Sequence, residues 1–286
     1  INMQLKNVHI TNMHIRAVPS AITDGVAMRI QGTQIKNTVV STMPLVTNGL
    51  LLHLDSRNPA SWPGSGTTWY DLSGNGKHAT FYANPSAINI GGPDVTEGTA
   101  IDGSTLMNNG DIYFDGRVST AQYYYAAGPN ISTTLTQWTI STWFKIHSFV
   151  PGNELPALFT GIYTGYNPNA SVNFSLQFYD GGVTNNNKVY AAFYNPNWQV
   201  ADPGFEPTLD TWYNATATYN GADINLYINN SLVGTATNRF STSLTSEVGY
   251  HVARRWDGWD TIDGYIPVVM AYDRALSAEE MTQNFN

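Results

Sequence analysis

Apolar and polar residues alternate with a period of two along much of this chain, which is the pattern of β-strands that bury one face. The clearest run, residues 138–146, divides into an apolar and a polar side: Trp138, Ile140, Phe144 and Ile146 against Thr139, Ser141 and Lys145. Such runs are separated by polar turn sequences, among them 73–76, 181–182, 220–221 and 229–230. Short strands joined by polar turns predict an all-β fold, an antiparallel β-sandwich of the jelly-roll type.

One predicted helix closes the chain. Ser277 and Glu280 form an S-x-x-E sequence, the capping box in which each side chain bonds the backbone amide of the other residue. This capping sequence comes shortly after a strand-like run at 263–271. The sequence therefore predicts a last strand, a turn and a short C-terminal helix.

The predicted last strand is apolar on both faces. One side collects Ile266, Val268, Met270 and Tyr272, and the other Pro267, Val269 and Ala271. A sandwich strand with one face in water should alternate apolar with polar residues, so a strand without this alternation is covered twice. We therefore expect the face of Val268 and Met270 to be an assembly contact, covered by the N-terminal segment or by a neighbouring subunit. Pro267 lacks an amide for the ladder, which favours an edge position or a bulge.

Residues 1–48 differ from residues 49–286 in charge. The first part has four basic residues against one acidic residue, whereas the second has nine against 20. Short strand-like runs at 4–10, 13–18 and 26–30 make the first part β-rich, but so few strands need something to cover them. We predict an N-terminal attachment segment at 1–48, docking through Arg16 and Arg29, and a sandwich domain at 49–286.

Four segments carry a family resemblance, in this order along the chain: 49–55 with 71–76, 138–146, 212–234 and 263–280. Together they are similar to the concanavalin A-like lectin/glucanase superfamily, in its laminin G-like branch. The resemblance implies two antiparallel sheets, with sugar or calcium ligands held by loops. The stretch 50–76 further resembles laminin G-like domains of tailed-phage and large-virus structural proteins. That likeness implies a component of the virion surface, in which residues 1–48 attach to the particle and the sandwich projects.

Composition excludes several classes of protein. The chain has no cysteine, and therefore neither a disulfide scaffold nor a thiolate metal site. No apolar run approaches the roughly 20 residues that cross a bilayer, so membrane insertion is not expected. The net charge is −8, with the acidic excess after residue 48, so nucleic acid is not expected as a partner.

The catalytic patterns of the resembled superfamily are missing. Its glucanases place two carboxylates on one strand, separated by one residue, so that both reach the sugar. None of the glutamates here has a second carboxylate two residues away in a strand-like run, and no G-x-S-x-G sequence marks a serine nucleophile. The protein is expected not to be an enzyme.

Calcium is the one metal ion that the sequence leaves open, and no cofactor is otherwise required. The histidines show no H-x-x-x-H pair. Oxygen ligands for calcium are offered by Asp55, Asp71, Asn75 and Asp263. Alternatively, Asp71 and Asn75 bond the backbone of their own turn, as Asp and Asn side chains do. Both interpretations remain open on the sequence.

Aromatic residues make up 13% of the chain and point to a carbohydrate ligand. Lectins stack exposed rings on the apolar face of a sugar, while Asn and Asp bond its hydroxyls. The best cluster follows Arg254 and Arg255, and the candidate ligand residues are Trp256, Asp257, Trp259 and Asp260, with Trp198 and Tyr166 elsewhere. The alternative is that these rings fill the core or plug loops.

The sequence favours a non-enzymatic virion surface protein, a capsid decoration or a tail- or fibre-associated subunit, whose lectin-like module binds host surface glycans. Its expected partners are other virion proteins, these glycans and further copies of itself in a homo-oligomer. Two alternatives remain, a purely structural subunit that binds no sugar and a secreted bacterial carbohydrate-binding protein.

Overall fold

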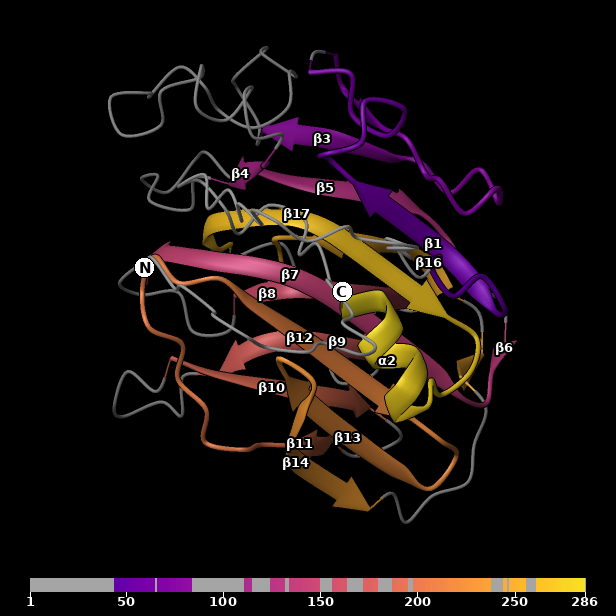
Figure 1. Cartoon of the computed structure of the whole chain (residues 1–286), viewed down its shortest axis with the longest axis vertical. Coiled ribbons are helices and arrows are strands. Elements are labelled where there is room, and N and C mark those ends of the chain that lie inside the picture. The colour runs from indigo at the N-terminus through magenta and orange to yellow at the C-terminus, as the bar shows by residue number, and fades with distance from the viewer. Residues whose placement is uncertain are drawn as a thin grey trace, which may run out of the picture.

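The computed structural model describes residues 44–64, 66–83, 111–114, 124–131, 134–149, 156–163, 172–179, 187–194, 198–237, 244–245, 247–255 and 261–285. Their strands form two antiparallel sheets that lie face to face (Figure 1). The predicted all-β sandwich with a short C-terminal helix is confirmed. The strands predicted at 4–10, 13–18 and 26–30, and the attachment residues Arg16 and Arg29, lie outside the described residues.

The front sheet is the one that helix α2 (Ala278–Phe285) overlies in Figure 1. Its strands follow one another in space as β1 (Leu50–Asp55), β17 (Asp263–Tyr272), β7 (Trp138–Ser148), β12 (Tyr213–Tyr219), β13 (Asp223–Ile228) and β14 (Ser231–Thr237), and β4 (Tyr113–Phe114) pairs with β17. The back sheet runs in the order β11 (Trp198–Ala201), β10 (Lys188–Tyr194), β9 (Val172–Tyr179), β8 (Ala157–Tyr163), β16 (Glu247–Val252), β5 (Tyr124–Pro129), β3 (Ala79–Ala83) and β2 (Thr68–Trp69). A small separate ladder joins β6 (Thr134–Leu135) to β15 (Leu244–Thr245).

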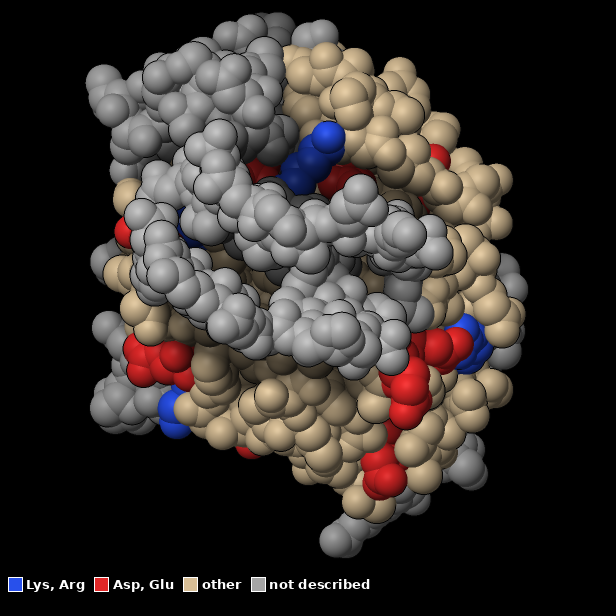
Figure 2. All heavy atoms as spheres, viewed as in Figure 1, with Lys and Arg blue, Asp and Glu red and all other residues tan. Residues whose placement is uncertain are grey.

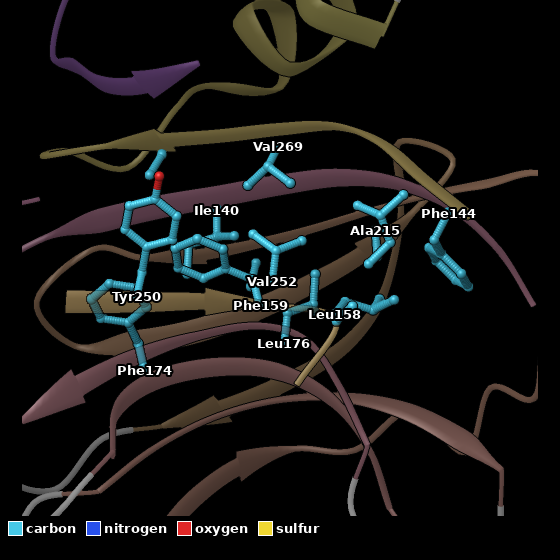
Figure 3. Close-up of a cluster of buried hydrophobic side chains, with 14 of the residues drawn as sticks. Ile140, Phe144, Leu158, Phe159, Phe174, Leu176, Ala215, Tyr250, Val252 and Val269 are labelled. Atoms are coloured by element: carbon cyan, nitrogen blue, oxygen red, sulfur yellow. The ribbon is translucent and has the colours of Figure 1, made fainter. Parts of the chain in front are cut away.

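The core lies between the two sheets (Figure 3). Ile140 and Phe144 of β7 point into it, as their alternation predicted. From the back sheet, Phe159 lies nearly parallel to Phe174 and to Tyr250, with ring centroids 6.0 and 5.5 Å apart. Burial of each large side chain stabilises the fold by about 1.5–3 kcal/mol, so this core holds the sheets together.

A bulge in β17 changes which of its residues share a face. Ile266, Val269 and Ala271 belong to the main core, whereas Met270 and Tyr272 point to the outside of the front sheet. The pairing with β7 shifts between Tyr265 and Val268. The expectation that Ile266 shares a face with Val268 and Met270 was therefore wrong, because the bulge at the proline reverses the alternation. Pro267, which has no backbone N–H, was expected at a sheet edge or at a bulge. Because β17 is not an edge strand, the bulge is the one of these two positions that the structure shows.

The outer face of β17 is covered by the chain itself. Met270 and Tyr272 pack with Val46, with Leu276 just before helix α2, and with Met281 of the helix. The Tyr272 hydroxyl donates to the Val46 carbonyl oxygen at 3.0 Å, and the Val46 amide donates to Asn284 Oδ1 at 3.0 Å. In the described part of the chain the cover of Val268 and Met270 is thus intramolecular, and it includes the helix, which the sequence prediction left out. Among the described residues, Pro44 and Val46, which belong to the predicted attachment segment 1–48, contact helix α2.

The capping box of helix α2 is confirmed. The Glu280 amide donates to Ser277 Oγ at 3.3 Å, and the Ser277 amide donates to Glu280 Oε2 at 2.9 Å. Arg274, in the exit turn of β17, donates to both Glu280 carboxylate oxygens at 2.7 Å. The turn and the helix are therefore tied to each other. This helix of eight residues, the one in the described part of the chain, is not long and apolar enough to cross a membrane.

Candidate functional site

The predicted ligand loop is fixed at its base. Trp256, Asp257, Trp259 and Asp260, and likewise Tyr166, lie outside the described residues, and Trp198 is described only as the first residue of β11. The residues on either side of the loop are described, and Arg254 forms a β-bridge with Thr261. The two ends of this segment therefore lie next to each other, between the end of β16 and the start of β17.

Next to this base, aromatic side chains line the outer face of the back sheet. Phe81 and Ala126 are register partners and point into the core, so their neighbours Tyr82 and Tyr125, which also pair, point outward. Val252 points inward on β16, which turns His251 to the same outer face. We call Tyr82, Tyr125, His251 and Arg254 the tyrosine row.

The members of the tyrosine row touch one after another. The rings of Tyr82 and Tyr125 are stacked, with centroids 5.1 Å apart and planes 16° apart. His251 meets Tyr125 edge-on at 5.3 Å, and the Arg254 guanidinium lies 4.1 Å from the Tyr125 ring centroid. A guanidinium over a tyrosine face is held by the negative ring face, so the row is a preformed surface. Tyr82 remains 42% exposed and is the ring most open to a ligand.

His251 is the neutral member of the row. Burial, reinforced by the charge of Arg254, lowers the pKa of His251 to about 4, although the bond to the Arg255 carbonyl acts the other way. His251 Nδ1 lies 3.3 Å from that carbonyl oxygen. Because a carbonyl oxygen only accepts, Nδ1 carries the proton, and Nε2 is then an acceptor. The row thus combines an exposed ring, a neutral acceptor and a positive charge, which suits a ligand with one apolar face and several hydroxyls.

The outer face continues from the row across the back sheet as hydrogen-bonded polar side chains. Thr160 is the register partner of His251, and its hydroxyl donates to the Arg254 carbonyl oxygen at 3.2 Å. Further along, Gln177 of β9 bonds the Tyr190 hydroxyl of β10. All three side chains are buried, so they stabilise this part of the sheet and are not part of its exposed surface.

The candidate calcium ligands form structural hydrogen bonds. Asp71 accepts the amides of His53, Ser73 and Lys77, each at 2.9 Å. Burial alone would raise the pKa of Asp71, but these amides and the Ser73 hydroxyl outweigh it, and the pKa is lowered. Asn75 donates to the Leu50 and Leu51 carbonyl oxygens at 2.9 and 3.1 Å. The interpretation that these side chains bond the backbone of their own turn is therefore confirmed for Asp71. The Asn75 side chain instead bonds the backbone of β1.

The other two calcium candidates are placed differently. Asp55 accepts the Arg57 amide at 3.0 Å, and Asp263 is 1% exposed and accepts the hydroxyls of Tyr113 and Ser148. Among the described residues, no group of three or more His, Cys, Asp or Glu side chains is arranged to hold a metal ion.

Sequence reasoning did not select the tyrosine row, although each member was visible in the chain. The signal for Tyr82 is its position beside Phe81 in a five-residue strand, and the signal for His251 is its position between two residues of the core. Neither signal shows that Tyr82 and His251 both contact Tyr125. The strands β3 and β16 lie far apart in sequence, and β5 lies between them in the sheet.

Solved structures of the same shape come from several kinds of protein. Domain 4 of the extracellular arabinanase AbnA from Geobacillus stearothermophilus, in complex with arabinotriose, matches with a TM-score of 0.54 and 17% identity, covering 83% of this chain and 98% of that one. A botulinum neurotoxin type C structure, described as dependent on two ganglioside molecules for cell entry, matches with a TM-score of 0.54 and 14% identity, covering 84% and 51%. The sialidase of Trypanosoma rangeli matches with a TM-score of 0.53 and 12% identity, covering 83% and 32%. This chain thus spans about half of the neurotoxin chain and a third of the sialidase chain. At these identities the likeness shows the fold.

The sequence itself has no match among curated proteins. A laminin G family model, described as the Concanavalin A-like lectin/glucanases superfamily, matches residues 115–282, more than half of the chain. With the two-sheet sandwich and its C-terminal helix described above, this match shows that the chain belongs to the concanavalin A-like lectin/glucanase superfamily.

Proposed function

We propose that the protein is a non-enzymatic saccharide-binding module that holds its ligand on the tyrosine row. The observation that carries the proposal is the row itself: a stacked pair of tyrosines, one 42% exposed, beside a guanidinium and a neutral imidazole. An exposed ring stacks on the apolar face of a sugar, and the polar groups around it bond the hydroxyls. The segment 256–260, with two tryptophans and two aspartates, starts two residues after Arg254 in the sequence and itself lies outside the described residues.

Two of the similar structures are described with molecules of the proposed ligand class. Arabinotriose and a ganglioside both present sugar rings. This agreement supports a saccharide as the ligand of the row. The absence of a closely spaced carboxylate pair on any strand-like run supports binding without hydrolysis.

The proposal is tested by comparing two tyrosines of equal exposure. Tyr82 and Tyr70 are each 42% exposed, but Tyr70 lies outside the row, edge-on to His78 at 5.3 Å. On an array of oligosaccharides that includes arabinotriose, Tyr82→Ala should weaken binding about tenfold, since loss of a stacked ring costs on the order of 1 kcal/mol. Tyr70→Ala should bind as the unchanged protein does. Equal binding by both variants would contradict the placement of the site, and no binding by the unchanged protein would contradict the function.

We also propose the setting predicted from the sequence, a surface position on a virion with the sandwich projecting from the particle. The support for this setting is the resemblance of residues 50–76 to laminin G-like domains of phage and large-virus structural proteins. Antibodies against the sandwich should label purified particles from the source culture. Label found in the particle-free medium instead would favour the alternative of a secreted carbohydrate-binding protein.

A further inference from the structure

A second group of aromatic and charged side chains lies on the opposite side of the molecule, on the outer face of the front sheet. Tyr265 of β17 is the register partner of Tyr113 on β4 and of Lys145 on β7. The pairing of β12 with β7 aligns Asn214 with Trp143, which sets Trp212 opposite Lys145. Four neighbouring chain segments thus contribute one side chain each to a line. We call these four residues the front row.

The front row is in contact along its length. The Tyr113 and Tyr265 ring centroids are 5.0 Å apart, and Trp212 lies 6.0 Å from Tyr265. The Lys145 ammonium lies 4.3 Å from the Tyr265 centroid and 5.1 Å from the Trp212 centroid. Tyr113 is buried, while Lys145, Trp212 and Tyr265 are each partly exposed. The row therefore presents two rings and an ammonium at the surface.

Lys145 lies against two ring faces. In the described part of the chain it makes no ion pair at 4.0 Å or less, although its positive charge acts against the rise in the pKa of Asp111. An ammonium has three donors, and ring faces use its charge without accepting conventional hydrogen bonds from it. Its N–H groups are therefore available to a ligand with oxygen acceptors.

Carboxylates stand close to the row and balance its positive charge. Asp111 accepts Arg57 Nε at 2.6 Å, and the Arg57 guanidinium lies 5.3 Å from the Trp212 centroid. Asp210, whose side chain is 60% exposed, bonds His147 Nδ1 at 2.9 Å. Figure 2 shows basic and acidic side chains next to one another in a recess of this face. With two cations and at least two carboxylates, the site favours a neutral ligand over an anion.

The burial of Asp111 also favours a neutral ligand, one that carries hydroxyl groups. Desolvation raises the pKa of Asp111, although the charge and hydrogen bond of Arg57 act to lower it. A carboxylate kept from water is a strong acceptor for a hydroxyl that reaches it. The pair of Arg57 and Asp111 thus offers donors and acceptors beside the Trp212 ring.

We propose that the front row is a second binding site for a neutral saccharide, with the sugar stacked on Trp212 and its hydroxyls bonded to Lys145 and Asp111. This inference rests on the proposed function, because it assigns the same class of ligand to another face. The two rows lie on the outer faces of different sheets, with the core between them. The module would then bind two saccharide chains at once and link them.

The proposal is tested on the full chain by calorimetric titration with the neutral oligosaccharide that binds best on the array. The unchanged protein should show two sites. Tyr82→Ala and Trp212→Ala should each weaken one of them about tenfold and leave the other unchanged, and the double variant should weaken both. Lys145→Met keeps the side-chain length and removes the donors, so it should weaken the front site about tenfold. It also serves as the readout if Trp212→Ala does not fold. Leu209→Ala, at a residue 43% exposed and close in sequence, is the matched control and should keep both sites.

The possible results separate the two proposals. One site in the unchanged protein that is lost in Tyr82→Ala, with Trp212→Ala and Lys145→Met binding normally, overturns the front site and keeps the proposed function at the tyrosine row. Loss of binding in Trp212→Ala and Lys145→Met alone supports the front site and overturns the role of the tyrosine row. No binding by the unchanged protein overturns both.

Discussion

Replacing Tyr272 by phenylalanine tests how the two ends of the described chain are joined. The side chain is fully buried, and its hydroxyl donates to the Val46 carbonyl oxygen at 3.0 Å and accepts from Asn284 Nδ2 at 2.9 Å. Phenylalanine keeps the ring and leaves both partners without this bond. Because an unmet buried polar group costs about 1–3 kcal/mol, Tyr272→Phe should lower the free energy of unfolding by that amount at neutral pH.

The same hydroxyl predicts how this difference changes in alkali. Burial raises the pKa of Tyr272 from 10.0 to about 12, although the bond from Asn284 and the charge of Arg274 act to lower it. The unfolded chain therefore loses this proton first, so the stabilisation is complete below pH 10 and declines between pH 10 and 12. The phenylalanine variant has no such proton. Between neutral pH and about pH 11 the gap between the two proteins should narrow by roughly 1.4 kcal/mol.

The measurement is urea unfolding followed by tryptophan fluorescence, for both proteins at neutral pH and in steps up to about pH 11. Tyr250 and Tyr265, whose pKa values are also raised by burial, are present in both chains, so their contributions cancel in the difference. Equal stability at neutral pH, or a gap that stays constant in alkali, would refute the reasoning.

Two further predictions concern the chain end and acid stability. A chain cut to 49–286 should unfold with about 2–4 kcal/mol less free energy than one cut to 44–286, because it lacks the buried Val46 side chain and its hydrogen bonds; equal urea midpoints would show that residues 44–48 add nothing. Burial and the charge of Arg254 lower the pKa of His251 from 6.5 to about 4 in the folded protein. As the pH falls below 6.5, the unfolded chain therefore takes up this proton before the folded protein does. Stability should therefore drop by roughly 1–2 kcal/mol down to about pH 5, and His251→Gln should abolish that part of the drop, as thermal melts in parallel buffers would show.

Local pattern was sufficient for the regular elements of the fold. Strand β7 was predicted from its alternation, because one of its faces meets the core along its whole length. The capping box was predicted for a similar reason, since both of its partners lie within four residues. The backbone role of Asp71 also depends on nearby turn amides, and it was one of two interpretations that the sequence allowed.

Features that depend on register between distant segments were not predictable in this way. The pattern of β17 predicted that its outer face is covered by the N-terminal segment or a neighbouring subunit. It did not show the contact of Tyr272 with Val46, 226 positions away, or the part that helix α2 has in the cover. The bulge at Pro267 was anticipated as a possibility, but its effect on Ile266 requires the pairing with β7. The tyrosine row depends on the order β3, β5 and β16 in the back sheet. A single sequence does not reveal that order.

The contact of Pro44 and Val46 with helix α2 also determines how the module is suspended. Gln283 of the helix donates to the Pro44 carbonyl oxygen, and Asn284 accepts the Val46 amide, so the first described residues lie against the helix on the front of the sandwich. A force that pulls Pro44 away from the sandwich would therefore act first on these hydrogen bonds and on the buried Val46 side chain, and only afterwards on the core between the sheets.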